Sequence, residues 1–406
     1  MKAPLLPVEE ALQRLLAMAS PVSSPETVSL SAADGRVLAH DLSSRLTHPP
    51  FAASAMDGYA VTAPNGVAAS SVFSVIGETA AGDPPASNLR SGEAMRIFTG
   101  APLPANADTV IIQEDTQRRP DGAIAVTEAV AAGANVRTAG LDFSVGQPIL
   151  GAGLKLDFRA LSLAAAAGHD RVEVYRKPKL AILATGNELV PPGTTPGTGQ
   201  IVASSGTGIS ALMRGSGADV VDCGIAGDSE AATRTAIAAA LATAPDVLVT
   251  IGGASVGDHD LVRPVLQSMG MTLDFWRIAM RPGKPLMVGK LDGTIIVGLP
   301  GNPVSSFVCA LVFLEPLMRM MAGLPPAKRL LKARLSGKLP PNGPRQAYLR
   351  ARIDQDANGG DVAEPLLQQD SSLLSVLALA DALLIRAPHA PEAKDGDPVD
   401  VLILDS

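Results

Sequence analysis

The sequence predicts a multidomain α/β plus β protein, with a doubly wound α/β domain flanked by an N-terminal helical and β region and a small C-terminal β domain. The 406 residues are enough for two to four domains of roughly 150 residues each. Continuous apolar runs, typical of buried parallel strands, alternate with helical stretches only between residues 178 and 326. Elsewhere, short β-like runs alternate with clusters of Gly, Pro, Asn and Asp.

The N-terminal region begins with an amphipathic helix predicted over residues 8–19, where apolar residues recur at helical spacing before Ser20-Pro21. From Thr27 to about Leu156, the short runs predict an all-β module with loops. Asp157 has the position of an N-cap for a helix over residues 159–167, which Gly168 ends.

The central region shows the alternation typical of βαβ units. Its first strand, at 180–185, is continuously apolar, which fits a sheet buried on both faces. Pro303 and Gly323 mark the start and the stop of its last helix. The other elements expected here are strands at 219–223, 247–251, 273–276 and 294–297 and helices at 208–214, 229–243 and 303–321.

A final β domain is predicted after Leu324-Pro325-Pro326, from about residue 327 to 406. Asn358-Gly359-Gly360 has the composition of a hairpin turn. Strands are expected at 345–353, 382–386 and 399–404.

The charge of the chain excludes some function classes. The 33 basic and 40 acidic residues give a net charge of −7, which disfavours non-specific nucleic-acid binding. Between residues 261 and 290 the balance is reversed, with five cations and one anion. That surplus indicates either a small anionic ligand or a solvated basic face.

Cysteine usage and hydropathy favour a soluble, cytoplasmic protein. Cys223 and Cys309 stand in apolar contexts, with neither disulfide nor zinc spacing. The N-terminus lacks a signal-peptide pattern, and no uncharged apolar run reaches the ~18 residues that span a bilayer. We expect no membrane partner and no nucleic-acid partner.

The loop after the apolar run at 246–251 is the most informative segment. Gly252, Gly253 and Gly257 allow the backbone to approach a ligand, and Ser255 and Asp260 add a hydroxyl and a carboxylate. Loops at the ends of buried strands are where α/β proteins bind ligands. The alternative is a flexible glycine turn. The pattern differs from the phosphate loop that ends in Gly-Lys-Ser/Thr, so ATP binding of that type is not indicated.

Two carboxylates follow other predicted strands. Glu188 is suited to proton exchange or cation binding, and its alternative is a surface glutamate in a βα loop. Asp228 precedes Ser229-Glu230 and a helix, so the residues alone favour a helix cap at this position.

Two further loops suit a negative ligand. The basic turn at 277–285 offers guanidinium forks and an ammonium to oxyanions, and its prolines stiffen it. The turn at 298–303 leads into a helix whose dipole favours an anion. The alternatives are a solvated basic loop and a plain βα turn. The residues concerned are Arg277, Arg281, Lys284, Pro300 and Asn302.

The β module carries candidates that are weaker when taken singly. Asp57 lies in an Asp-Gly pair, which more often forms a turn than a catalytic site. Thr99 and Glu114 have equally plain readings, as a turn threonine and a solvated carboxylate.

Six short motifs occur in order along the chain and resemble one known family. That family is the molybdopterin molybdenumtransferases, which include MoeA, the gephyrin E domain and the plant Cnx E domain. The resemblance covers almost the whole chain, and six motifs in order are far more specific than any one. They are Ser-Ala-Met-Asp-Gly-Tyr-Ala-Val at 54–61, Thr-Gly-Ala-Pro at 99–102, Thr-Gly-Asn-Glu-Leu at 185–189, Gly-Gly-Ala-Ser-Val-Gly-Asp-His-Asp at 252–260, Pro-Gly-Lys-Pro at 282–285 and Leu-Pro-Gly-Asn-Pro-Val at 299–304.

The resemblance implies an architecture and a reaction. The parts would be a discontinuous helical domain at 1–45 and 143–177, a β domain at 46–142, a molybdopterin-binding α/β domain at 178–326 and a β domain at 327–406. Family members are homodimers whose sites combine the α/β domain of one subunit with the β domain of the other. The implied reaction inserts molybdenum from molybdate into adenylylated molybdopterin and releases AMP, assisted by Mg²⁺. Other proteins of molybdenum cofactor biosynthesis are left open as partners.

The resemblance also implies roles for individual residues. Asp57 and Thr99 would reach the site from the partner subunit. Glu188, Asp228 and Asp260 would be the acidic residues near the metal, which they ligate, and near the phosphoanhydride and pterin. The residues implied to bind the substrates are Gly252, Gly253, Ser255, Gly257, Arg277, Arg281, Lys284, Pro300, Asn302, Arg350 and Ser371, with Arg345 and Ser372 beside the last two.

The chain departs from the family pattern at a few positions. Ala203 stands where the family usually has Asp, and Leu141 stands where it has Glu. The loss at Ala203 motivates an alternative, a non-catalytic relative that carries or senses molybdopterin or its cofactor. A scaffold role is a third reading, and the absence of a long linker or fused domain argues against it.

Overall fold

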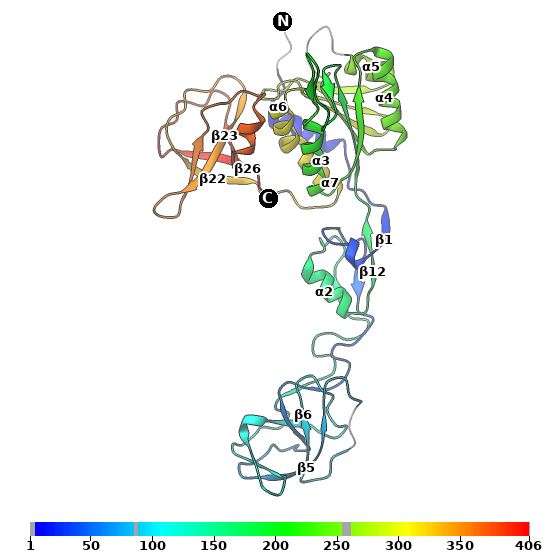
Figure 1. The fold of residues 1–406 in the computed structure, drawn as a ribbon, viewed down its shortest axis with the longest axis vertical. Coiled ribbons are helices and arrows are strands. Elements are labelled where there is room, and N and C mark those ends of the chain that lie inside the picture. The colour runs from blue at the N-terminus through cyan, green and yellow to red at the C-terminus, as the bar shows by residue number, and fades with distance from the viewer. Residues whose placement is uncertain (1–4, 85–87, 254–260, 406) are drawn as a thin grey trace. The chain divides into compact units, whose positions relative to one another are not determined.

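The structure is a computed structural model that describes residues 5–84, 88–253 and 261–405 (Figure 1). The chain forms two compact units, one of Met1–Glu26 with Tyr175–Ser406 and the other of Thr27–Val174. The first unit holds the α/β and C-terminal β regions, and the second holds the β module with one helix. The four domains with the boundaries given above remain a prediction.

The second unit contains a six-stranded sheet. On strand β4, which lies between β7 and β6, Tyr59 and Val61 pack into one apolar cluster and Ala60 into another, because successive side chains point to opposite faces. The strand order is β7-β4-β6-β5-β9-β8, and the strands are β4 (Gly58–Val61), β5 (Val72–Thr79), β6 (Glu93–Ile97), β7 (Thr109–Ile112), β8 (Thr116–Arg118) and β9 (Ile124–Val126).

A small helical module completes this unit. Asp157 caps helix α2 (Phe158–Ala166) as predicted, accepting hydrogen bonds from the backbone N–H groups of Arg159 at 3.0 Å and Ala160 at 3.1 Å. Two two-stranded pairs lie beside it, β1 (Pro25–Ser29) with β12 (Arg171–Tyr175) and β2 (Leu42–Ser43) with β11 (Pro148–Leu150). A third pair, β3 (Ala53–Ser54) with β10 (Val136–Arg137), packs against the six-stranded sheet. Two 3₁₀ turns are η1 (Leu30–Ala32) and η2 (Gln113–Asp115).

The first unit is built on a mostly parallel sheet with the strand order β16-β13-β17-β21-β20-β18. Along β13, Leu180 and Ile182 pack on one face, and Ala181 and Leu183 pack on the other, so both faces are buried as predicted. The strands are β13 (Lys179–Thr185), β16 (Asp219–Ala226), β17 (Val247–Ile251), β18 (Thr272–Trp276), β20 (Met287–Leu291) and β21 (Thr294–Leu299). A short parallel pair, β14 (Leu189–Val190) and β15 (Ile201–Val202), follows β13.

Helices cover both faces of this sheet (Figure 1). One face packs against α1 (Val8–Ala17), α3 (Ser205–Gly215) and α6 (Pro303–Cys309), and the other against α4 (Glu230–Ala242) and α5 (Val262–Ser268). The doubly wound architecture expected from the sequence is therefore confirmed.

The last helix of this domain is interrupted by a π-helical turn. The turn η3 (Ala310–Leu314) joins α6 to α7 (Glu315–Met321). Pro316 lacks an N–H and its ring would clash with the carbonyl of Val312 in a regular helix, so the wider turn accommodates it. Among the described residues, only the stretch Pro303–Met321 is long and apolar enough to cross a membrane, and 78% of its apolar window is buried inside the protein, as in a core helix.

The C-terminal region forms a closed β sheet. Its order is β19-β23-β24-β22-β26-β25, and β23 also pairs with β25, which closes the barrel. The predicted hairpin at 358–360 joins β23 to β24, where Gln355 pairs with Asp361. The elements are β19 (Met280–Arg281), β22 (Leu330–Leu335), β23 (Gln346–Gln355), β24 (Asp361–Pro365), α8 (Leu374–Ala378), β25 (Ala382–Arg386) and β26 (Pro398–Ile403).

Candidate active site at the carboxyl edge of the α/β sheet

The strand directions bring several predicted site residues to one edge. β13, β16, β17 and β21 are mutually parallel, so the loops that follow them emerge on the same side. β18 is antiparallel to β20, and β20 is antiparallel to β21, so β18 also ends at this edge. Glu188, Asp228, Gly252, Arg277 and Pro300 all follow strands that end here.

The first glycine of the loop after β17 is required by its surroundings. Gly252 has φ +93°, and a Cβ there would lie 2.7 Å from the carbonyl oxygen of Thr185. Its N–H donates to the carbonyl of Leu299 at 3.1 Å. The Cβ position at Gly301 lies 3.7 Å from the Gly252 Cα, so the loops after β17 and β21 touch.

The loops after β13 and β16 are locked together by a reciprocal pair of hydrogen bonds. The N–H of Asn187 donates to Asp228 Oδ2 at 2.9 Å, and the N–H of Asp228 donates to Asn187 Oδ1 at 3.0 Å. Asp228 is not the helix cap, because Ser229 takes that position and accepts from the N–H of Ala232 at 3.2 Å. The cap reading of Asp228 is therefore wrong, and Oδ1 of this exposed carboxylate has no hydrogen-bond partner in the described part of the chain.

Glu188 stands beside this pair. Its carboxylate folds over Gly186, where an added Cβ would lie 2.3 Å from Glu188 Oε2, and Gly186 has φ +147°. The backbone carbonyl of Glu188 accepts from Ile201 at 2.7 Å, and the N–H of Ala203 donates to Val190 at 2.9 Å. Ala203, where the family resemblance leads us to expect Asp, thus directly follows β15, the strand that pairs with the segment after Glu188.

The loop after β21 meets the C-terminal barrel. Asn302 Nδ2 donates to Ser371 Oγ at 3.0 Å, and the N–H of Val304 donates to the carbonyl of Ser371 at 3.0 Å. The hydroxyl of Ser306 fastens the turn by donating to the carbonyls of Pro300 and Asn302. The predicted residues Pro300, Asn302 and Ser371 are therefore brought together.

The basic turn is shared between the two regions. Arg281 lies in β19, which pairs in parallel with β23 of the barrel, opposite Ala347. The carbonyl of Lys284 accepts from the N–H of Ile278 at 3.0 Å, which closes the turn. The side chains of Arg281 and Lys284 are exposed, and neither forms an ion pair within the described ranges.

Arg277 adopts an unusual conformation at the start of this turn. Its φ is +78°, although it is not glycine, and its guanidinium lies over the ring of Trp276, 4.0 Å from the centroid. Arg263 lies over the same ring, also at 4.0 Å. In the sequence, Arg263 is recognisable only as a local cation, because its stacking on Trp276 depends on the fold.

Arg350 is buried, at 2% exposure, in contrast to the exposed cations of the turn. Its backbone N–H and Nε both donate to Gln369 Oε1, at 2.9 and 3.2 Å, and its Nη1 donates to the carbonyl of Asp370 at 2.7 Å. Burial lowers the pKa of the Arg350 guanidinium, against the opposing charge of Asp370. Arg350 thus shapes the segment that carries Ser371. Its neighbour Arg345 is half-buried.

Asp57 and Thr99 meet in the other compact unit. The N–H and the hydroxyl of Thr99 both donate to Asp57 Oδ1 at 2.8 Å. These bonds, backbone first, hold the pKa of the Asp57 carboxyl below its ordinary value, with a smaller contribution from the charge of Arg96. Arg96 is itself packed over the rings of Tyr59 at 5.0 Å and Phe98 at 5.2 Å.

Three predicted site residues lie outside the described ranges. These are Ser255, Gly257 and Asp260. Within the described ranges, no group of three His, Cys, Asp or Glu side chains is arranged to hold a metal. The predicted metal ligands Glu188 and Asp228 lie on adjacent strand ends, and the set with Asp260 stays a prediction.

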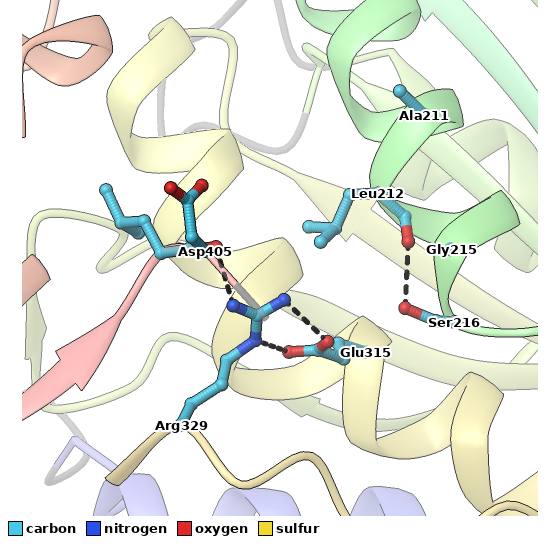
Figure 2. A pocket seen from close by; sticks show the side chains of 8 residues that line it. Ala211, Leu212, Gly215, Ser216, Glu315, Arg329 and Asp405 are labelled. Atoms are coloured by element: carbon cyan, nitrogen blue, oxygen red, sulfur yellow. Dashed lines mark hydrogen bonds and ion pairs between the residues drawn. The ribbon is translucent and has the colours of Figure 1, made fainter. Parts of the chain in front are cut away.

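A cavity of about 300 Å³ lies away from this edge, between α3, α7 and the chain end (Figure 2). Arg329 occupies it, donating from Nε and Nη2 to the Glu315 carboxylate at 2.6 and 3.0 Å and from Nη1 to the carbonyls of Ile403 and Leu404 at 2.9 and 2.6 Å. Because four of its five N–H groups are satisfied by the protein, Arg329 acts as a clamp between α7 and the barrel rather than as a ligand-binding residue.

The fold and the residues at the carboxyl edge together define a class: a multidomain α/β protein whose sheet carries acidic and basic residues at its carboxyl edge, where its loops contact a C-terminal barrel. The sequence matches three family models in order: the MoeA N-terminal region (domain I and II) over residues 6–168, a probable molybdopterin binding domain over 181–320, and the MoeA C-terminal region (domain IV) over 332–404. The chain belongs to the MoeA family of molybdopterin molybdenumtransferases, and the predicted family is confirmed.

Individual relatives agree with this assignment. A molybdopterin molybdenumtransferase of Haemophilus influenzae is 36% identical over 319 residues, covering 79% of this chain and 78% of that protein. Molybdopterin molybdenumtransferase 2 of Mycobacterium tuberculosis is 36% identical over 356 residues, covering 85% and 87%. The crystal structure of a molybdopterin biosynthesis MoeA protein from Pyrococcus horikosii matches with a TM-score of 0.83 and 31% identity, covering 99% of this chain and 100% of that one. Membership of an enzyme family does not favour the carrier alternative.

Proposed function

We propose that this protein inserts molybdenum from molybdate into adenylylated molybdopterin and releases AMP. The observation that carries the proposal is the convergence of anion-binding and acidic residues on one edge of the α/β sheet. There, Asn302 and Ser371 meet at 3.0 Å and Arg281 pairs into the barrel sheet. The family to which the chain belongs supports the same chemistry.

The residues divide by charge. Molybdate is a tetrahedral dianion, so the exposed cations Arg281 and Lys284, with the hydroxyl of Ser371, suit its charge and its need for hydrogen-bond donors. Gly252 and Gly253 leave the backbone of the β17 loop accessible to the pterin substrate. The acidic pair, Glu188 and Asp228, faces the phosphoanhydride side of the substrate in this assignment.

The donor set at this edge fits Mg²⁺. Glu188 and Asp228 are exposed carboxylates on neighbouring loops, and Mg²⁺ is commonly bound by one or two carboxylates together with substrate phosphates and water. Glu188 and Asp228 would hold the ion, with Asp260 as the third ligand implied by the family. When bound, Mg²⁺ would polarise the phosphoanhydride for AMP release.

We further propose a homodimer in the cytoplasm, in which Asp57 and Thr99 complete the site of the partner subunit. Their hydrogen-bonded pair is exposed in the second compact unit, with an ionised carboxylate favoured by its lowered pKa. The same unit exposes large apolar side chains that an interface would cover, namely Leu46 at 53%, Leu141 at 63%, Val145 at 65% and Phe158 at 76%.

A turnover assay tests the function. Purified protein is supplied with adenylylated molybdopterin, molybdate and Mg²⁺, and AMP release is measured together with reconstitution of a cofactor-free molybdenum enzyme. We expect both products to appear, and we expect Asp228→Asn to lower both without altering the melting temperature by more than a few degrees. Tight binding of the adenylylated substrate with no AMP would instead establish the carrier role motivated by Ala203.

A further inference from the structure

The indole of Trp276 packs against two guanidinium groups. Arg263 Cζ and Arg277 Cζ each lie 4.0 Å from its ring centroid. Because both Cζ atoms lie 4.0 Å from the same centroid, they are at most about 8 Å apart, a span that one phosphate group can bridge at the edge of the indole by accepting from both guanidinium groups.

The two cations in this stack lack compensating charge. Neither guanidinium forms a hydrogen bond or an ion pair with another described residue, and the Nε of each is buried without a partner there. Asp274, the single acid between residues 261 and 290, is occupied by Arg14, which bonds its two carboxylate oxygens at 2.8 and 3.0 Å. Buried, unpartnered donors are costly, so this arrangement indicates a site built for an anion.

The stack lies at the same edge as the candidate active site. Trp276 is the last residue of β18, whose direction matches that of the parallel strands. It is opposite Met287 of β20, and Met287 is opposite Gly298 at the end of β21. The N–H of Arg277 donates to the carbonyl of Leu286 at 3.2 Å, so the basic turn starts from this stack.

We propose that Arg263, Trp276 and Arg277 form a second oxyanion site, which binds the phosphate group of the nucleotide-capped substrate. The proposal rests on the proposed function, because that reaction brings two anions to one edge, molybdate and the adenylyl phosphate. Exposed Arg281 and Lys284 serve the first, and the paired guanidinium forks, matched to phosphate geometry, serve the second. Arg263 is a further binding residue, and Trp276 is a positioning residue that holds both arginines.

The protein carries its own probe of this site, since Trp276 is the only tryptophan in the chain. The full-length protein is titrated with AMP, with inorganic phosphate and with molybdate, while the indole emission is recorded and binding is measured by calorimetry. We expect AMP to change the emission saturably, with phosphate acting more weakly and molybdate binding without a comparable change.

Substitutions assign the effect to the stack. Arg263→Gln removes one charged donor and is expected to raise the Kd for AMP about tenfold or more and to reduce the emission change. The matched control is Lys290→Gln, which removes a cation from the same segment; Lys290 pairs with Ile295, towards the opposite end of β21, and the variant should bind AMP normally. Trp276→Leu, measured by calorimetry alone, should weaken AMP binding, and Trp276→Phe should restore part of it.

Several outcomes would overturn the proposal. They are AMP binding that leaves the emission unchanged, an Arg263→Gln variant with wild-type affinity for AMP, and an emission change with molybdate but not with AMP. None of these measurements requires turnover. Saturable AMP binding at Trp276 in a protein that releases no AMP would therefore contradict the proposed function alone. Normal turnover without any change of the Trp276 emission on AMP binding would contradict only the second oxyanion site.

Discussion

The carboxylate of Asp57 is held ionised mainly by two hydrogen bonds from Thr99, with a smaller contribution from the charge of Arg96. Because the pKa of Asp57 is lowered in the folded protein, its hydrogen bonds contribute stability above the ordinary aspartate pKa, and this contribution is lost as the pH falls through the lowered value. Thr99→Val keeps the backbone donor and removes the hydroxyl. We expect the pKa of Asp57 to rise towards its ordinary value, measured by NMR titration of the carboxyl carbon.

The same variant tests the role of Asp57 in the reaction. If Asp57 acts as an anion, the acidic limb of the pH–rate profile moves to higher pH in Thr99→Val. It stays in place in Thr127→Val, which changes an exposed threonine that does not bond Asp57. An unchanged acidic limb together with a raised pKa would remove Asp57 from the rate-determining ionisation.

Gly252 gives a second prediction at this scale. Gly252→Ala forces a side chain into a left-handed conformation and places its Cβ 2.7 Å from a backbone carbonyl, so we expect a loss of about 1–3 kcal/mol in the free energy of unfolding. Gly343→Ala is the control, since its φ is not in the left-handed region and a Cβ there meets nothing within 4 Å. Chemical denaturation of both variants, followed by circular dichroism, should separate them; equal stability would show that the β17 loop relaxes freely.

Ala203 gives a third prediction at the scale of single residues. Its backbone follows β15, which pairs with β14 directly after Glu188. Restoring the family carboxylate in Ala203→Asp adds a negative charge near Glu188 and Asp228, so we expect Mg²⁺ to bind several-fold more tightly, measured by calorimetry. Ala203→Asn separates the effect of charge from that of size. Equal Mg²⁺ affinity in all three proteins would mean that this position does not face the ion.

Candidate site residues can be found from the sequence where the chain is locally distinctive, but which of two neighbouring candidates takes a given role depends on the fold. Asp228 and Ser229 both suit a helix cap, and only the fold shows that Ser229 caps while Asp228 pairs with Asn187. Arg350 resembles a ligand-binding arginine in sequence, but its burial and its bonds to Gln369 are tertiary facts. Its direct contact with substrate remains a prediction.

At the scale of elements, the clamp between α7 and the barrel is the clearest target. Arg329 and Glu315 are buried at 6% and 3% exposure, so Arg329→Met leaves an uncompensated carboxylate and should cost about 3–5 kcal/mol. The double variant Arg329→Met/Glu315→Leu should recover much of this loss. Thermal unfolding distinguishes the single from the double variant. If the double variant is as unstable as the single one, the lost stability comes from packing and not from the unpaired carboxylate.

An exposed ion pair supplies the comparison for the clamp. Arg234 and Glu230 form an i,i+4 pair on α4 at 3.3 Å, and breaking it should cost only about 0.3–0.5 kcal/mol. If breaking the exposed Arg234–Glu230 pair and breaking the buried Arg329–Glu315 pair cost similar free energies of unfolding, burial would not explain the importance of the clamp.

The predicted helices and strands that the structure confirms are those with a strong local sequence pattern. β17 and β25 match their predicted bounds, and the helix 303–321 is present, interrupted by its π turn. The elements that were missed include β19, β20, β22, α5 and α8. β20 contains Gly289 and follows a proline-rich turn, β19 has two residues, and its pairing with β23 is a long-range contact that no local window contains.

At the scale of the whole molecule, the shared site predicts complementation. If Asp57 acts in the partner's site, a dimer of Asp57→Asn with Asp228→Asn contains one site carrying both substitutions and one carrying neither. Mixing the two inactive proteins under conditions of subunit exchange should restore roughly a quarter of wild-type activity, because about half the dimers are mixed and each has one intact site. Exchange without recovery, with exchange verified by mass spectrometry, would place Asp57 and Asp228 in the same subunit's site or outside it.

The pairing of β19 with β23 has a consequence for how the enzyme could let its product go. Arg281, which we assign to molybdate binding, belongs to the α/β domain by its position in the chain. By hydrogen bonding, however, its strand β19 is part of the barrel sheet. If the barrel moved away from the α/β domain, one of two things would follow. Either the Arg281 guanidinium would move away from its anion, or the two-residue strand β19 would separate from β23. In the first case, product release would require the barrel to move. A disulfide that cross-links the barrel to the α/β domain should then slow release of the molybdenum cofactor.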